Sequence, residues 1–175
     1  TDTVTPVAVS CVDNQYTVGG LLSGLVAGDT VVLQNNSGDA LTLAADGAFT
    51  FATAVDFGDV YAALVSSQPS QPSEACSVTN GSGTIPASNV TNVSVICALN
   101  SFAVGGSVSG LATGETVVLQ NSGADDQTLS ADGNFVFSQQ ADGASYSVAV
   151  STQPVGQTCI VADGGGTLSG ADVSS

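Results

Sequence analysis

The residues of this chain with the clearest capacity for chemistry are its four cysteines, Cys11, Cys76, Cys97 and Cys159. Cysteine thiolates hold zinc or pair as disulfides, and structural zinc sites use closely spaced Cys and His ligands. The chain contains no His and no Cys-x-x-Cys pair. With no Met and no Trp beside the four cysteines, the composition favours disulfide chemistry in an oxidising compartment over a metal centre.

The other reactive side chains lack the partners that catalysis requires. A serine nucleophile needs a basic neighbour, and the chain has no His or Lys. Asp125, Asp126 and the Asp-Gly turns show no calcium-loop spacing and no pairing across a cleft, which favours solvated turn carboxylates. The Val-Gly-Gly segments and the glycines at 164–166 precede no helix or Lys, which favours turns or bulges over phosphate binding. We expect no enzyme, no cofactor and no metal.

Charge restricts the partners. The chain has no Lys or Arg and 15 Asp and Glu, for a formal net charge of −15. Nucleic acid and anionic membrane surfaces attract cationic side chains, so neither is an expected partner. Hydrophobic residues make up 43% of the chain, enough for a packed core, while only 9% of residues are charged. Polar neutral residues must therefore cover most of the exterior.

The compartment follows from several features together. Apolar runs such as 60–65 are far shorter than the roughly 18 residues of a membrane-spanning helix. The chain starts at Thr1 rather than Met, which indicates that a targeting peptide has been removed, and it offers no cleavage site to trypsin-like proteases. We expect a secreted, extracellular or cell-surface protein. Four N-glycosylation sequons, at Asn35, Asn80, Asn89 and Asn92, leave glycosylation open.

An internal repeat organises the elements around these residues. The segment 16–25 matches 102–111 at an offset of 86, as do Val-Val-Leu-Gln-Asn at 31–35 and 117–121 and Asp-Gly-x-Phe-x-Phe at 46–51 and 132–137. Small deletions then bring Tyr61 onto Tyr146 and Cys76 onto Cys159. The chain is a tandem repeat, with predicted domains at 12–97 and 98–175 after an N-terminal segment 1–11.

Each copy has the pattern of an all-β domain. Alternation places Phe49 and Phe51 on one strand face, as it does Tyr146 and Val148, and Ala-Asp-Gly at 45–47 and 131–133 predicts hairpin turns. Seven short strands with regular turn signals favour an immunoglobulin-like β-sandwich. In the first copy we expect strands at about 16–23, 30–35, 39–43, 48–53, 60–67, 75–80 and 90–97.

The pattern resembles the tandem Ig-like repeats of secreted bacterial and archaeal surface proteins. The elements that carry the resemblance are Val-Gly-Gly-x-x-Ser-Gly-Leu, Val-Val-Leu-Gln-Asn, Asp-Gly-x-Phe-x-Phe, Gln-Pro before a Cys, and Asn80-Gly-Ser-Gly. They cover nearly the whole chain. They are scaffold features, so the resemblance implies a structural fold and no chemistry.

The ends of the repeat point to assembly. The first copy closes with a strand ending in Val93-Ser-Val-Ile-Cys97, and the second copy stops at Ser175, which aligns with Asn92. The N-terminus matches the absent strand at the same offset of 86. Val7, Val9 and Cys11 align with Val93, Val95 and Cys97, so their side chains should point to the same face of the strand. The predicted donor strand is Val4, Thr5, Pro6, Val7, Ala8, Val9, Ser10 and Cys11.

Linker length indicates where this strand goes. Only four residues, 12–15, separate Cys11 from Tyr16, and 98–101 separate the two copies. A two-domain ring with such hinges is sterically unfavourable, so we expect the strand to complete another subunit. Such head-to-tail contacts generate open filaments, and the logic is similar to donor-strand pilus assembly. Residues 1–6 and 170–175 align with one another and compete for one position at the seam.

The same frame assigns the cysteines. Cys76 and Cys97 lie in neighbouring predicted strands and should pair within one chain. Cys159 is the equivalent of Cys76, and the equivalent of Cys97 is Cys11, so these two should pair between subunits; free or locally paired thiols are the alternative. The predicted function is a structural subunit of an extracellular, pilus-like homopolymer with an unknown surface or cell-contact ligand. The main rival is an adhesin or carbohydrate-binding Ig-like stalk; an arbitrary fragment of a longer repeat protein is another.

Overall fold

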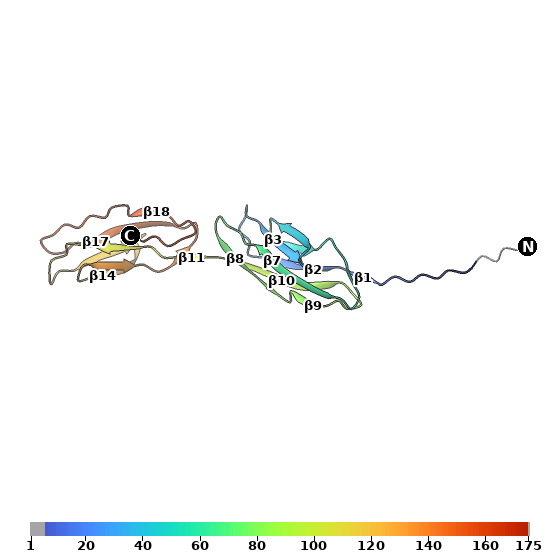
Figure 1. The fold of residues 1–175 in the computed structure, drawn as a ribbon. Helices are drawn as coiled ribbons and strands as arrows, with labels where there is room; N and C mark the ends of the chain where they lie inside the picture. The colour runs from blue at the N-terminus through green and yellow to red at the C-terminus, as the bar shows by residue number, and fades with distance from the viewer. Residues whose placement is uncertain (1–5, 175) are drawn as a thin grey trace, which may run out of the picture. The chain divides into compact units, whose positions relative to one another are not determined.

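The computed structural model describes residues 6–174 and contains strands but no helix in that range (Figure 1). The chain divides into two compact units. The first holds the chain up to Leu25 with Thr30–Ser67 and Cys76–Ile96, and the second holds Val26–Asp29, Gln68–Ala75 and the chain from Cys97 onward. We describe the structure by its two repeat copies, 12–97 and 98–175, because the repeat allows each residue to be compared with its equivalent.

The first copy contains two four-stranded sheets and one short strand pair. One sheet has the order β5-β2-β10-β8, the other has the order β4-β3-β7-β9, and β1 pairs with β6. The strands are β1 (Gln15–Tyr16), β2 (Val18–Ser23), β3 (Val31–Asn35), β4 (Asp39–Leu43), β5 (Gly47–Thr50), β6 (Val55–Asp56), β7 (Val60–Ser67), β8 (Glu74–Thr79), β9 (Ser82–Thr84) and β10 (Val90–Leu99).

Alternation along these strands separates core from surface. In β3, Val31 and Leu33 are buried while Val32 and Gln34 are only partly covered. The predicted shared face of the two phenylalanines is confirmed, since Phe49 and Phe51 are buried and their rings meet edge to face at 5.8 Å. Side chains from both four-stranded sheets therefore build one core. The short strands β6 and β9 were not predicted from the sequence.

The second copy has fewer paired strands. Its sheets are β14-β13-β17-β18, the pair β12-β15 and the pair β11-β16. The strands are β11 (Ser101–Phe102), β12 (Gly105–Val108), β13 (Val117–Asn121), β14 (Ala124–Leu129), β15 (Gly133–Val136), β16 (Gln140–Ala141), β17 (Ser145–Thr152) and β18 (Gly165–Thr167).

The core of the second copy is less completely covered. Its buried residues are Val104, Val117, Leu119, Phe137 and Leu168. Three residues that pack against this cluster are only partly buried, although their equivalents in the first copy are buried: Val108 for Leu22, Phe135 for Phe49 and Tyr146 for Tyr61. The difference lies on one side of the copy, where β12 and β17 line an open groove.

The aspartates of the two predicted hairpin turns do more than close the turns. The Asp46 carboxylate accepts hydrogen bonds from the backbone amides of Gly24 and Leu25, both at 2.9 Å. Its equivalent Asp132 accepts them from Gly110 and Leu111 at 2.9 and 2.8 Å. Each carboxylate thus ties the loop after β2 or β12 to the turn before β5 or β15. Both carboxylates are exposed, as expected for turn carboxylates, and in addition they hold the neighbouring loop through these backbone hydrogen bonds.

The Asp132 clasp should make the second copy sensitive to acid. Hydrogen bonds from Gly110 and then Leu111 hold the pKa of the Asp132 carboxyl below its ordinary value of 3.8. A group whose folded pKa is depressed contributes fully above its unfolded pKa and loses the contribution as pH falls through the folded value. Between pH 5 and pH 3 we therefore expect the urea midpoint of the second copy to fall, measured by tyrosine fluorescence and circular dichroism.

The matched variants are Asp132→Asn and Asp13→Asn. Asp132→Asn removes one accepting oxygen, so the midpoint should already be lower at neutral pH and should depend less on pH. Asp13 lies in the exposed N-terminal segment, and Asp13→Asn should follow the parent chain. Equal pH dependence in Asp132→Asn and the parent would contradict the role of the clasp.

Candidate functional site

The closing strand of the first copy shows what a complete copy looks like. β10 lies between β2 and β8 in its sheet. It pairs in parallel with β2, residues 93–96 standing opposite 20–23. Val93 is 1% exposed, Val95 is 0% exposed and Cys97 is also buried, while Ile96 points outward. Three alternate side chains of this strand therefore fill the core, and its backbone joins the two neighbours.

Glycine at position 20 makes this close pairing possible. A Cβ built on Gly20 would overlap the carbonyl oxygen of Val93, and the next nearest atoms also belong to the Val93 backbone. Gly20 lies inside β2 and Gly106 inside β12, and neither has a positive φ. The Val-Gly-Gly segments therefore lie within strands rather than turns, and the expected bulge is present only as a register shift in the β10–β2 pairing between Val90 and Val93, opposite residues 18–20. They are strand positions where a neighbouring backbone approaches closely.

The run at 164–166 is corrected in the same way. Gly165 and Gly166 lie in β18, where Gly166 leaves room for the Tyr146 ring. A Cβ on Gly166 would come within 2.7 Å of the Tyr146 hydroxyl oxygen. Gly164 is also closely packed, since a Cβ there would lie 2.6 Å from the Val148 carbonyl oxygen, whereas Gly165 has only ordinary contacts.

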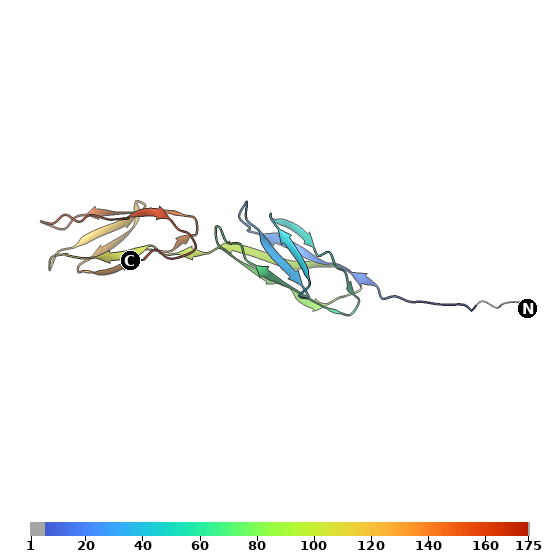
Figure 2. The same cartoon turned by 45° about the horizontal axis from the view of Figure 1, so that its top comes forward.

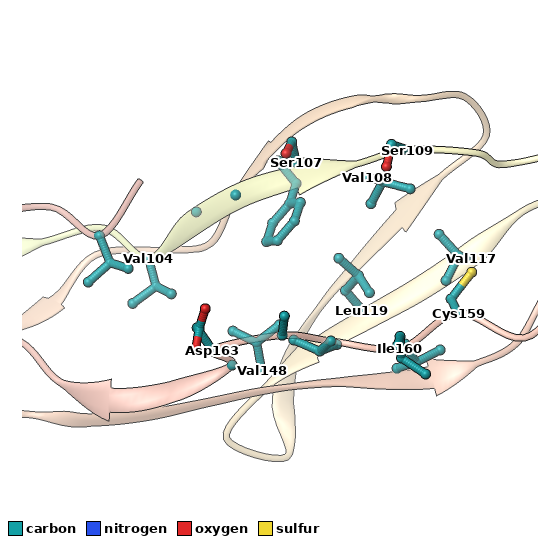
Figure 3. A pocket seen from close by; sticks show the side chains of 18 of the residues that line it. Val104, Ser107, Val108, Ser109, Val117, Leu119, Val148, Cys159, Ile160 and Asp163 are labelled. Carbon is teal, nitrogen blue, oxygen red and sulfur yellow. The ribbon is translucent and has the colours of Figure 1, made fainter. Parts of the chain in front are cut away.

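The second copy has a groove where the first has β10. The groove has a volume of about 660 Å³. Figure 3 shows Val108, Leu119 and Val148 around it, contributed by β12, β13 and β17. Cys159 and Ile160 line its other side, on the segment 157–164. Its apolar floor thus consists of core positions that β10 covers in the first copy.

The first rim of the groove is the open edge of β12. β12 pairs with β15 on one side. On the other side the described chain gives it a single parallel bridge at its start, between Val104 and Val173. There the Gly105 amide donates to the Val173 carbonyl at 2.7 Å, and the Val173 amide donates to the Ala103 carbonyl at 2.9 Å. Val173 therefore holds the place that Val90 has in the first copy, opposite Val18.

The second rim is a segment that lacks strand structure. Residues 157–164 align with 74–81, which include β8, yet they form no strand. The reason is the pairing order: β8 is an edge strand whose one neighbour in the sheet is β10. Residues 6–174 supply no equivalent of β10 beside the segment 157–164, which therefore has no neighbouring strand to pair with. Cys159 is partly exposed there, whereas its equivalent Cys76 is buried.

The Phe135 ring lies beside Gly106, its partner in the β12–β15 pair, and borders the groove. A Cβ built on Gly106 would meet the Phe135 ring first, at 3.0 Å from Cζ. In the equivalent place beside Gly20 the nearest atoms are the Val93 backbone. Phe135 is partly buried and lines the groove, whereas its equivalent Phe49 is buried. Sequence reasoning paired the two phenylalanines by parity and did not anticipate this difference.

The predicted donor strand is exposed in the single chain. Pro6, Val7, Ala8, Val9, Ser10 and Cys11 form no strand, and the side chains of Val7 and Val9 are 92% and 85% exposed. In both ribbon views this segment runs away from the strands of the first copy (Figure 2). Val4 and Thr5 lie outside the described residues. The structure of one chain does not bring the donor strand to a groove, and its docking stays a prediction.

The cysteines fall into two classes. Cys76 and Cys97 are disulfide-bonded, and Cys11 and Cys159 are free thiols. Cys11 is exposed in the N-terminal segment, and Cys159 lies in the wall of the groove. The first copy thus carries one covalent link between β8 and β10. The free pair occupies the equivalent positions of the repeat.

Other candidate sites add little. Among residues 6–174 no group of three His, Cys, Asp or Glu is arranged to hold a metal ion. Asp125 accepts a hydrogen bond from the Ser138 amide at 2.7 Å and Asp126 one from Gln120 Nε2 at 2.8 Å. In the sequon at Asn35 the side chain is buried and binds the Ala62 amide at 3.1 Å. Its equivalent Asn121 binds the Ser147 amide, a role that sequence reasoning missed although both asparagines end the repeated Val-Val-Leu-Gln-Asn.

Comparison with known proteins adds a fold-level likeness. No protein-family model matches the chain, and no curated protein matches its sequence. The TIE protein of Bacillus anthracis superimposes with a TM-score of 0.57 at 7% identity, covering 92% of this chain. The chain spans 33% of that protein's length. The shaft pilin SpaA of Lactobacillus rhamnosus GG aligns over 92% of this chain and 97% of its own, at 10% identity and a TM-score of 0.35. The described chain contains no helix with the length and hydropathy needed to cross a bilayer.

Gly20 and Gly106 allow a direct test of the groove. The background carries Val7→Asp, Val9→Asp and Cys11→Ser, so that no donor strand fills the groove. There we expect Gly20→Ala to destabilise the first copy by about 1–3 kcal/mol, because the new methyl group meets the Val93 backbone. Gly106→Ala should cost less, because the Phe135 ring is a side chain that can shift. Gly38→Ala is the control, since a Cβ there meets nothing closer than 3.9 Å. Equal losses for Gly20→Ala and Gly106→Ala in urea unfolding would contradict an open groove.

Proposed function

We propose that the chain is the repeating structural subunit of an extracellular, pilus-like filament. In this proposal residues 1–11 of one subunit enter the second copy of the next and serve as its closing strand. The observation that carries the proposal is the first copy itself. It shows the fold completed by β10, and the exposed N-terminal segment repeats the inward residues of that strand.

Apolar burial and backbone hydrogen bonds would both favour such a contact. Burial of Val7 and Val9 contributes about 1.5–3 kcal/mol each. Backbone bonds to the open edge of β12 add about 1 kcal/mol apiece, since edge amides and carbonyls gain partners. Ordering the exposed segment and bringing two subunits together oppose these terms. A filament in which every groove is filled also pairs the open edge of β12 in each subunit, which removes one site of unspecific aggregation.

The geometry of donor and acceptor sets the type of assembly. Donor and groove are different surfaces of the chain, so each subunit can accept one strand and give one. Such heterologous contacts propagate as a filament unless their rotation closes a ring. Strand addition to an open sheet edge supplies affinity through the backbone and selectivity through the alternate side chains. Export to an oxidising compartment fits the disulfide at Cys76 and Cys97.

Removal of the donor strand tests the proposal. The full chain should form filaments visible by electron microscopy, in a process that depends on concentration. A shortened chain starting at Val12 should remain monomeric or aggregate without order, since it has grooves but no donor. Normal filaments from the shortened chain, or monomers from the full chain at every concentration, would overturn the proposal. The first outcome would point to a groove filled from another segment, and the second to a stalk module.

Ionic strength should control the rate of assembly. Each subunit carries a net charge of −15 with no Lys or Arg, so approaching subunits repel one another. Raising the salt from about 0.01 M to about 0.15 M shortens the Debye length from about 30 Å to about 8 Å. We expect faster filament growth by light scattering at the higher salt. A rate that falls with added salt would contradict this and would indicate that charge attraction drives assembly.

A further inference from the structure

We propose that the donor strand docks in one defined register, with residues 7–10 of one subunit opposite 106–109 of the next, and that this register delivers Cys11 to Cys159 for disulfide formation. This register rests on the proposed function and assigns the contact between two subunits residue by residue. The occupant is the N-terminal segment of a second copy of this chain. The groove of the second copy is the acceptor.

The register follows from the first copy. There residues 93–96 stand opposite 20–23 in a parallel ladder. The repeat offset of 86 converts this pairing into residues 7–10 opposite 106–109. Val7 and Val9 then face the core as Val93 and Val95 do, while Ala8 and Ser10 face outward. A shift by one residue would expose both valines and bury Ser10, so the parity selects the register.

The junction between the two chains falls at a natural interruption of the ladder. The pairing of β10 with β2 shifts between Val90 and Val93, where three residues of β10 span two of β2. In the second copy the chain's own Val173 already holds the place of Val90. The donor is needed only from Val7 onward. Pro6 precedes it, aligned with the interrupted stretch, where its missing amide leaves no ladder bond unmade.

In this register the Phe135 ring turns away from Gly106 when the donor strand docks. Its ring is the nearest group to the Gly106 position that the Val7 backbone would approach, as the Val93 backbone approaches Gly20. In the first copy Phe49 is buried beside Phe51, which is where Phe135 should move. Phe135 and Phe137 already meet edge to face at 5.5 Å. Docking therefore replaces a side chain over Gly106 with a backbone.

The same register brings the two free thiols together. Cys97 follows Ile96 in β10 and is disulfide-bonded, as is Cys76 in β8. Cys11 and Cys159 hold the equivalent positions, and both are free in the single chain. Once Cys11 is held by the ladder, its sulfur lies beside that of Cys159. The segment 157–164 should then pair with the donor as β8 pairs with β10.

The covalent step needs an external disulfide as oxidant. The Cys159 thiolate attacks a small disulfide such as oxidised glutathione, forming a mixed disulfide and releasing one glutathione thiolate. The Cys11 thiolate then attacks the Cys159 sulfur and releases the second. Two protein thiols lose two electrons and two protons, and one glutathione disulfide becomes two thiols. Docking raises the effective concentration of Cys11 at the mixed disulfide, so the second step becomes specific.

The test uses the full chain as acceptor and a peptide of residues 1–14 as donor. The acceptor carries Val7→Asp, Val9→Asp and Cys11→Ser, so it cannot dock or lock its own strand. In glutathione buffer we expect a disulfide between peptide Cys11 and Cys159, located by peptic digestion and mass spectrometry. A peptide with Ser10→Cys and Cys11→Ser should react at least about 10-fold more slowly, since its thiol lies on the other face of the strand.

Matched acceptor variants separate docking from simple thiol reactivity. Gly106→Ala places a methyl group where the Val7 carbonyl must lie, so it should slow the reaction with the Cys11 peptide to the rate of the shifted peptide. Gly38→Ala is far from the groove in sequence and opens onto free space, and it should leave the rate unchanged. Equal rates for both peptides, or no effect of Gly106→Ala, would overturn the register.

Failure of the register and failure of the filament are distinguishable. A specific Cys11–Cys159 bond with the peptide, but no filaments from the full chain, would support the register and contradict the filament function. Filaments whose unreduced chains run as monomers in detergent would contradict the thiol pairing and leave the function standing. We expect filaments that give a ladder of linked chains, which collapses on reduction to the 17.0 kDa subunit.

Discussion

The backbone ladder around the closing strand is the interaction on which each repeat copy depends. β10 is the one element of the first copy that joins β2 to β8, and it adds three inward side chains to the core. In the second copy the equivalent positions are open, and several changes follow together. Residues 157–164 lack strand structure, and Phe135, Val108 and Tyr146 are only partly buried. One missing neighbour accounts for all of them.

The two copies allow one repeated segment to be compared with and without a neighbouring strand. Cys159 and Val161 repeat the alternation of Cys76 and Val78, and the sequence alone assigns both segments the same strand. Only the segment with a neighbour forms one. An edge strand makes all of its ladder hydrogen bonds with its one partner, so alternation is necessary for it and not sufficient.

Most strands could be predicted because alternation, turn residues and the repeat all agree at those positions. The bounds of β3 and β7 follow closely from Val-Val-Leu-Gln-Asn and from the run after Val60. The Asp46 and Asp132 clasps could not be predicted, because each joins residues about twenty positions apart and nothing local marks the pairing. The strand glycines were misinterpreted for a related reason. A glycine in a turn and a glycine under a neighbouring backbone look the same in one sequence.

Charge and recognition are separated along the chain. Residues 6–12 contain no charged side chain, and the groove is lined almost entirely by apolar and neutral residues, with Asp163 its one carboxylate. Docking would therefore bury valines and backbone without removing charges from water, which is the costly part of many interfaces.

The remaining carboxylates lie outside this contact. Their mutual repulsion is weakened by salt and acts on every approach between subunits, including wrong ones. In the proposed assembly, a strand that fits the groove would gain short-range contacts that oppose this repulsion, which an unspecific encounter of two exposed edges would lack. The acidic surface would then disfavour wrong partners of the open groove more than the right one.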